Sequence, residues 1–469
     1  MVSAIKRLFS HRGQAQADMT QGSITRHLIL YALPLFFANL LQYLYSAVDA
    51  WVLGQSGQTE AYAAVGSLSS VTQTLVALFW GFSQGAGIII SRSFGAKDER
   101  RVLKTAHTAM VVTVLIGLFL TTVGMLFSPY LLRIVLGADG NPEIYRHAKT
   151  YLLIFFGGIT PMLIYNMGAE ICRAVGNARY PSLFLTVGSI LNIILDIVFV
   201  FGFDYGVAGV AWATVLAQVI SSALTVAILF GKRSPVHLSP KQLRVDASLT
   251  KQIIILGIPI AVSSSITSLS SLFVQSYIAG ADGDQTVILA GYTTFTKVIS
   301  ILQQPKAALH VAGAVFVAQN LGAKKLDRVR RALRSLVLLS VSFMLPIYLG
   351  TVIFAENLPY LFVSDPAVTS LTANLFRTIT LFYLFDCVSG ATANTLRGAG
   401  KTGVMMATTL SIHVALRQIY LFTVSRFISN HYLAIMFSLP FASIVYCAVI
   451  TLLCMRHLKR LQREDTRSL

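Results

Sequence analysis

The chain has 469 residues, of which 55% are hydrophobic and only 12% are charged, and its mean hydropathy is +0.68. This composition excludes an ordinary soluble enzyme built from two or three domains. Lysine and arginine number 37 against 19 acids. Such an excess can indicate nucleic-acid binding, but the distribution of the charges along the chain, described below, argues against it. The four cysteines are scattered through apolar segments without CxxC spacing, which indicates small buried hydrophobes rather than disulfides or metal ligands.

In chain order, the predicted elements are about twelve apolar stretches, each long enough to supply the ~20 helical residues that cross a bilayer core. Residues 1–22 are polar and the first apolar run is of spanning length, so no signal peptide is predicted. The stretches are centred near residues 40, 75, 116, 161, 192 and 218, and then near 265, 303, 344, 383, 414 and 443. The sequence therefore predicts an all-α polytopic membrane protein with six helices in each half.

Basic residues cluster between alternate pairs of these stretches. They occur near the N-terminus, in "SRSFGAKDERRVLK", in residues 232–251, in "GAKKLDRVRRALR" and in the tail at 456–467, whereas the intervening turns carry mostly acids. All five clusters lie on one side if the helix count is right. The positive-inside rule then predicts a multi-pass protein of the cytoplasmic (inner) membrane with both termini in the cytoplasm, and it explains the basic composition without a nucleic-acid partner.

The chain also repeats itself. "ALPLFFANL" is echoed by "GIPIAVSSS", "SFGAKDERRV" by "NLGAKKLDRV" and "CRAVGN" by "LRGAGK", at offsets of about 225 residues. The predicted organisation is a cytoplasmic segment (1–27), a first lobe (28–231), a cytoplasmic linker (232–250), a second lobe (251–456) and a cytoplasmic tail (457–469). Two parallel six-helix bundles with a cleft between them are typical of transporters that work by alternating access.

These motifs together resemble the multidrug and toxic compound extrusion (MATE) transporters, in particular their DinF-like branch. The resemblance covers residues 22–456 and includes "SAVDAWVLG", "AQNLGAKK", "RAVGNARYP", "LNIILDIVFV" and "LRGAGKTG". It implies export of organic cations driven by an inward flow of protons or sodium ions. It also implies that the chain is not an enzyme.

Two carboxylates lie inside apolar helices of the first half. Asp196 is about nine residues before the turn at Tyr205, hence roughly 13 Å from the outer face, and Asn192 shares its helix face. Asp49 lies in the outer half of the first helix, one turn after Tyr45. A charge at this depth costs several kcal/mol and normally faces a cavity or a partner. Because no Lys or Arg lies at matching depth, each acid either holds a proton or binds a mobile cation.

The resemblance implies a cation-coupling site, for protons or sodium ions, at Asp49, Asn192, Asp196 and Thr214. Tyr45 and Pro34, the helix proline about four turns before Asp49, are predicted to support it. The alternative interpretation is that Asp196 only bonds the backbone of a neighbouring helix.

In the second half, Asp386 matches an acid of the family's sodium-coupled NorM-like branch, whereas Thr267 replaces the acid expected on the seventh helix. Lys297, Lys306 and Arg417 are also predicted to lie within the membrane. Asp386 is therefore either a second coupling residue or one partner of a buried ion pair.

The remaining motifs do not indicate catalysis. "GAGKTG" lacks the first glycine of a phosphate-binding loop, because Thr395 stands there, and His310 and His413 are lone histidines on apolar segments. The predicted protein is a monomeric antiporter without a cofactor that exports amphipathic organic cations. A flippase for lipid-linked precursors, which would use basic residues to meet phosphates, is the alternative within the superfamily, and a channel or receptor is a third interpretation that the two-lobe repeat disfavours.

Overall fold

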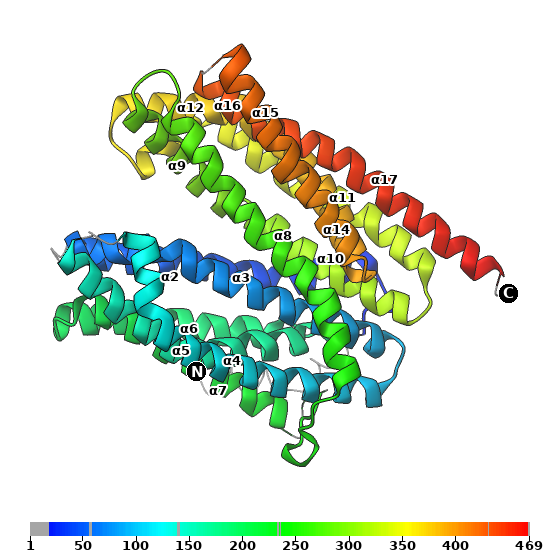
Figure 1. The fold of residues 1–469 in the computed structure, drawn as a ribbon. Helices are drawn as coiled ribbons and strands as arrows, with labels where there is room; N and C mark the ends of the chain where they lie inside the picture. Colours follow the sequence, from blue (N-terminus) through cyan, green and yellow to red (C-terminus); the bar gives the residue numbers. More distant parts are fainter. Residues whose placement is uncertain are drawn as a thin grey trace. The chain divides into compact units, whose positions relative to one another are not determined.

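The computed structural model describes residues 18–55, 59–137, 141–231, 234, 236–429 and 431–467. The predicted positive residues at the extreme N-terminus lie outside them. The described residues are helical with short connections, and no strand occurs among them (Figure 1). The all-α prediction is confirmed.

The first half contains six helical passes. Their bounds are α2 (Ile24–Gln55), α3 (Thr59–Gly95), α4 (Glu99–Leu136), α5 (Pro142–Ala174), α6 (Arg179–Ile197) continued by the π-helical turn η2 (Val198–Gly202), and α7 (Gly206–Phe230). Local signals set several of these ends. Asp98 accepts a hydrogen bond from the backbone N–H of Arg101 and so caps α4, while Asn141 caps α5 directly before Pro142.

The second half has six passes as well, but four are interrupted. The short turn η3 (Pro240–Gln242) precedes α8 (Ala247–Ala279), and the next pass is divided at Gln303 into α9 (Gln285–Leu302) and α10 (Gln304–Gly322). They are followed by α11 (Leu326–Ile353), η4 (Leu358–Leu361) and the pass formed by α12 (Pro366–Ile379), η5 (Thr380–Phe382) and α13 (Tyr383–Gly398). The last two passes are α14 (Thr402–Thr409), η6 (Leu410–Leu416), α15 (Arg417–Thr423) and η7 (Val424–Ile428), and then α16 (Tyr432–Met436) with α17 (Ser438–Arg467).

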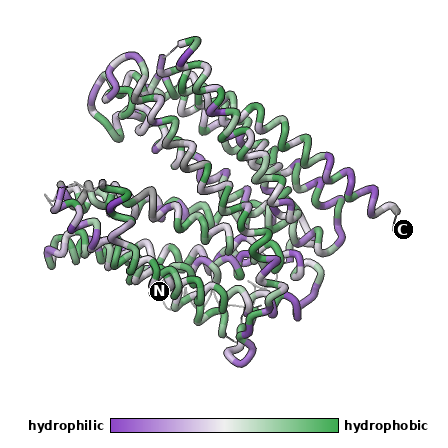
Figure 2. Tube along the Cα trace, in the orientation of Figure 1, coloured by the Kyte–Doolittle hydropathy of each residue, from purple (hydrophilic) through white to green (hydrophobic). Residues whose placement is uncertain are grey.

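Ten of the described helices are long and apolar enough to cross a membrane. The passes outside this set are α9–α10 and α14–η7, both of which are divided into shorter helices. Figure 2 shows hydrophobic residues along the middle of most helices, with hydrophilic residues in the loop before α8 and at the end of α17. The structure is therefore a multi-pass membrane protein with twelve helical passes in its described residues.

The chain forms two compact units. Unit 1 comprises residues 1–18 and Pro34–Ile258, and unit 2 comprises Met19–Leu33 and Pro259–Leu469. The unit boundaries inside α2 and α8 thus fall at the helix prolines Pro34 and Pro259. These units follow contacts rather than the sequence repeat, and the lobe boundaries drawn from the repeat stay a prediction.

In unit 2, the segment before α2 is held by the motif "AQNLGAKK" and by the start of α11. The amide of Asn320 donates to the Met19 carbonyl (3.2 Å), and Lys325 Nζ donates to the Thr20 carbonyl (2.9 Å). The guanidinium of Arg328 donates to the carbonyls of Met19 (3.1 Å) and Gly22 (2.9 Å). Because Met19 and Thr20 are almost fully buried, these donors satisfy carbonyls that water does not reach. We call residues 19–22 the N-terminal anchor.

In unit 1, the segment before α8 is held in a similar way by the start of α4. The ring of His107 accepts from the backbone N–H of Ser239 (2.9 Å), and Lys104 forms an ion pair with Asp246 (2.5 Å). That hydrogen bond from Lys104 lowers the pKa of the Asp246 carboxyl. The first turns of α8 then approach α3 so closely that a Cβ on Gly85 would lie 2.8 Å from the backbone nitrogen of Gly257. The GAK motifs of the two halves therefore precede α4 and α11, and the start of each of these helices holds the segment that leads into another helix, α8 and α2 respectively.

We expect Arg328→Ala to destabilise the protein. The substitution removes a charged donor from buried carbonyls of the N-terminal anchor, and hydrogen bonds to charged groups are worth about 1.5–3 kcal/mol. Thermal unfolding of the purified protein in detergent measures the loss. Arg331→Ala is the matched control, because Arg331 is an exposed residue of the same helix, and it should leave the melting temperature unchanged. Equal melting temperatures for both variants would contradict a structural role for the anchor.

Candidate functional site

The carboxylate of Asp196 is fully buried although its helix is almost wholly apolar. Asp196 lies near the end of α6, one turn after the buried Asn192, and η2 begins two residues later. A single π-helical turn inside an α-helix often accompanies a functional site, because it redirects the side chains around it. Asn192 and Asp196 therefore share one inward face of α6, as the i,i+4 spacing predicts.

Asp49 comes from a distant part of the chain to the same place in unit 1. It lies in α2 beyond Pro34, in the part of the helix that belongs to unit 1, and it is half-buried. The carboxyl groups of Asp49 and Asp196 lie close enough to interact electrostatically. Two carboxyl groups can share a hydrogen bond only when one of them holds a proton, because two carboxylates have no donor between them.

Asn192 joins the two remaining predicted residues to this pair. With its amide oriented to satisfy its neighbours, its nitrogen donates to Oδ1 of Asp49 (3.1 Å) and its oxygen accepts from the backbone N–H of Thr214 (3.3 Å). The hydroxyl of Thr214 lies 3.4 Å from the same amide. The four residues predicted to form the cation-coupling site thus come together from α2, α6 and α7.

One oxygen of this cluster has no partner. Oδ1 of Asp196 is buried and makes no hydrogen bond within the described part of the chain. A small cavity about large enough for one water molecule adjoins the cluster and is lined by Tyr45, Asn192 and Thr214 among others. An unpartnered carboxylate oxygen costs free energy unless it binds a proton, a cation or water. The arrangement therefore fits a site that takes up one small cation.

The donor set limits which cation fits. It offers two carboxyl groups, an amide oxygen and a hydroxyl, and the described residues contain no group of three or more His, Cys, Asp or Glu side chains that would hold a metal ion. Oxygen ligands suit hard cations such as a proton or a sodium ion.

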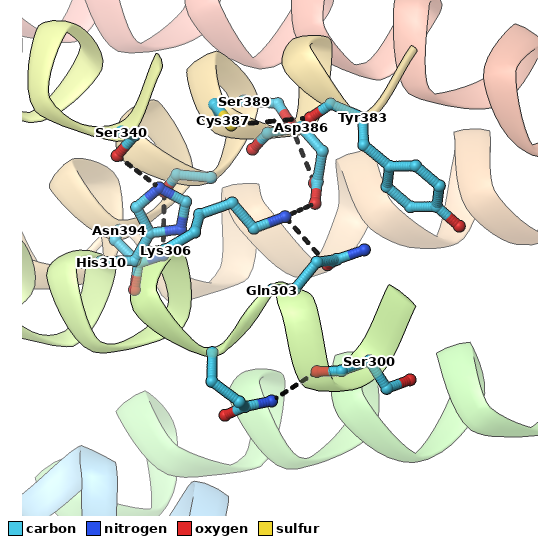
Figure 3. A network of polar contacts seen from close by, with 12 residues as sticks. Ser300, Gln303, Lys306, His310, Ser340, Tyr383, Asp386, Cys387, Ser389 and Asn394 are labelled. Carbon is cyan, nitrogen blue, oxygen red and sulfur yellow. Dashed lines mark hydrogen bonds and ion pairs between the residues drawn. The ribbon is translucent and has the colours of Figure 1, made fainter. Parts of the chain in front are cut away.

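The second-half acid has a different environment. Asp386 on α13 forms an ion pair with Lys306 on α10, and Lys306 also donates to the side-chain oxygen of Gln303 (2.9 Å) (Figure 3). The side chain of Lys306 is 5% exposed, whereas that of Asp386 is 38% exposed. A cation from the chain itself therefore neutralises Asp386, which is the ion-pair alternative raised by the sequence.

The network around this pair includes residues that sequence reasoning did not assign. Gln303 lies at the break between α9 and α10, and the ring of His310 is 3.3 Å from the hydroxyl of Ser340. Figure 3 shows Lys306 directed at Asp386 and His310 directed at Ser340. The dipeptide Gln303–Gln304 before Pro305 is the only sequence signal for the break. His310 is a core histidine with a hydroxyl partner.

The other two predicted intramembrane cations do not contact Asp386. Nε of Arg417 donates to the hydroxyl of Ser438 (3.2 Å), and Arg417 is buried. Lys297 is exposed on α9. His413 lies in η6 with its ring 4.5 Å from that of Tyr446, which is ordinary packing. Of the three candidates, Lys306 alone neutralises Asp386 in the described structure.

Comparisons with known proteins agree with this architecture. The family model MatE matches the chain twice, over residues 34–198 and 259–421, which confirms the internal repeat. A probable multidrug resistance protein from Bacillus subtilis, YoeA, is 26% identical over 398 residues, covering 83% of this chain and 84% of the relative. The probable multidrug resistance protein NorM from Thermotoga maritima is 28% identical over 399 residues and covers 84% of each chain.

A solved structure has the same fold. The MOP superfamily transporter from Pyrococcus furiosus superposes with a TM-score of 0.89 at 22% identity, over 95% of this chain and 98% of that one. Assignment to the DinF-like branch stays a prediction. The two matches of the family model span most of both halves, and the chain accordingly belongs to the MatE family, whose members are transporters and not enzymes.

Proposed function

We propose that the protein is a secondary active antiporter that exports amphipathic organic cations across the cytoplasmic membrane in exchange for protons or sodium ions. The cluster of Asp49, Asn192 and Asp196 carries this proposal, since it is a buried acid pair with one unpartnered oxygen in a membrane protein. The names of the two relatives as multidrug resistance proteins support export of varied small molecules.

Coupling follows from the electrostatics of the pair. Two adjacent carboxylates within a membrane-spanning bundle repel each other, so binding of a proton or sodium ion stabilises the pair. A conformation that exposes the pair to the outside would load the ion, and one that exposes it to the cytoplasm would release it. Thr214 and Tyr45 would support the site by adding oxygen ligands at its edge.

We assign no coupling ion to the second half. The ammonium group of Lys306 already occupies the position beside Asp386 that a mobile cation would take. A mobile cation could bind Asp386 only by displacing the ammonium group of Lys306, which is part of the chain itself. Coupling therefore uses the first half, and Asp386 serves the structure of unit 2.

We further propose that the protein is a monomer without a cofactor and that both of its termini lie in the cytoplasm. The basic loops support the orientation through the positive-inside rule. The flippase alternative is not favoured, because the relatives reported above are named for drug resistance.

Replacing Asp196 by Asn tests the coupling site. Asp196→Asn keeps the shape of the side chain and removes the charge, so gradient-driven efflux from proteoliposomes should fall to the background of empty vesicles, and Asp49→Asn should behave similarly. Imposing a pH gradient and a sodium gradient separately identifies the ion. Asp282→Asn, which changes an exposed loop acid, should retain full transport. Full driven efflux by either cluster variant would refute the assignment.

The role of Asp386 is tested by stability. Asp386→Asn leaves the buried Lys306 without its counter-charge, which should cost toward the lower end of about 3–5 kcal/mol because Asp386 is partly exposed. We expect a lowered melting temperature with transport per folded molecule largely kept. Adding Lys306→Met should restore part of the stability. A stable Asp386→Asn protein without transport would instead make Asp386 a functional residue.

The proline of the first helix is expected to matter more than its repeat counterpart. Pro34 and Pro259 each remove a backbone hydrogen bond at a unit boundary, but only α2 carries an acid beyond its proline within the same unit. Pro34→Ala should therefore impair efflux more than Pro259→Ala at matched expression, while ion binding at Asp49 persists. Equal losses, or a larger loss at Pro259, would contradict this asymmetry.

A further inference from the structure

The second half of α9 carries an exposed polar stripe. Thr293, Lys297 and Ser300 are exposed at spacings of four and three residues, so they lie on one face of the helix, with the half-buried Thr296 beside them. The opposite face is buried and contains Phe295, Val298 and Ile299. The helix is therefore amphipathic within a membrane-spanning pass.

Lys297 lies too deep for its ammonium group to reach water at the membrane surface. It is about twelve residues, or ~18 Å, after the start of α9 and about 25 residues before the end of α10. The hydrocarbon core is ~30 Å thick, so Lys297 lies within the core when the pass crosses it. A lysine that faced lipid there would carry a large desolvation cost.

Other exposed faces of unit 2 show what a lipid-facing surface looks like in this chain. On the membrane-spanning part of α11 the exposed side chains are mostly large and apolar, such as Leu338, Phe343 and Leu349, and carry no charge. Such a surface matches hydrocarbon, and the stripe on α9 does not. The α9 stripe therefore faces a hydrated path through the membrane rather than lipid.

Within the described part of unit 2, Lys297 has no counter-charge. The nearby intramembrane acid, Asp386, is already paired with Lys306, and Lys297 makes no hydrogen bond or ion pair with a described residue. The flanking hydroxyls of Thr293 and Ser300 donate to carbonyls of their own helix (2.8 Å and 2.7 Å). The ammonium group of Lys297 is therefore left with its full hydrogen-bonding capacity.

We propose that Lys297 is the anion-binding residue of a substrate subsite on α9, which receives a carboxylate or phosphate group of the transported molecule. This rests on the proposed export function and narrows its substrates to amphipathic molecules that carry an anionic group beside their cationic one. A fixed ammonium group would repel a purely cationic drug, and it forms a charge-assisted hydrogen bond with a zwitterionic one. The buried pair of Lys306 and Asp386 contributes no net charge beside it.

The subsite is tested with two dyes that differ in one group. Rhodamine B is a zwitterion with a free carboxylate, and its methyl ester is a cation of nearly the same shape. Binding of each dye to the purified protein and initial transport rates are measured in phosphatidylcholine proteoliposomes, which contain no anionic lipid to compete. Lys297→Met should weaken binding of rhodamine B and raise its KM about tenfold, the loss of ~1.4 kcal/mol. Values for the methyl ester should not rise.

Two further variants sharpen the result. Lys297→Arg keeps the charge and should retain most of the affinity for rhodamine B, whereas Lys149→Met removes an exposed lysine of α5 in unit 1 and should change nothing. Equal effects of Lys297→Met on the two dyes, or none on either, would overturn the subsite while leaving the antiporter proposal intact. Absence of gradient-driven transport of both dyes by the unmodified protein, with selective binding of rhodamine B retained, would reject the antiporter proposal and keep the subsite.

Discussion

Two acids of unit 1 share one buried place without a cation from the chain to neutralise them. Asp196 is completely buried, Asp49 lies close to it, and these groups lie in helices long and apolar enough to cross a membrane. In such surroundings a negative charge persists only beside a positive one. The amide of Asn192 and the unpartnered oxygen of Asp196 fit the proposed role, in which a proton or cation enters at this point.

The second half meets the same constraint in the opposite way. There the chain supplies Lys306 to Asp386, so the charge is neutralised permanently and the pair holds helices α10 and α13 together. The two halves of the chain thus treat an intramembrane acid differently: no described basic side chain neutralises the pair in unit 1, whereas a lysine neutralises Asp386. The surplus of positive charge in unit 2, from Lys297 and Arg417, distinguishes it further from unit 1 and bears on which substrates it can contact.

Sequence alone predicted the features that the bilayer forces on a chain. The apolar stretches and the shared face of Asn192 and Asp196 follow from helix length and periodicity, and the structure confirms both. The repeat was visible in paired motifs, and the double match of the family model confirms it. The meeting of Asp49 with Asp196 came from family resemblance, because residues so far apart carry no local signal of contact. The choice of Lys306 among three cations was not predictable, since it depends on the break at Gln303 and on helix rotation. The N-terminal anchor was missed because its acceptors are backbone carbonyls, which every residue has.

The first helix connects these parts through the covalent chain. Its beginning is fixed in unit 2, where Arg328 and Asn320 hold the N-terminal anchor, and its remainder carries Asp49 in unit 1. Along α2, unit 2 ends at Leu33 and unit 1 begins at Pro34. A change of charge at Asp49 acts on a helix whose far end cannot move without breaking buried hydrogen bonds. We therefore propose that a displacement caused by ion binding at Asp49 would be concentrated at Pro34, the one position of the helix interior whose backbone lacks a donor to resist it.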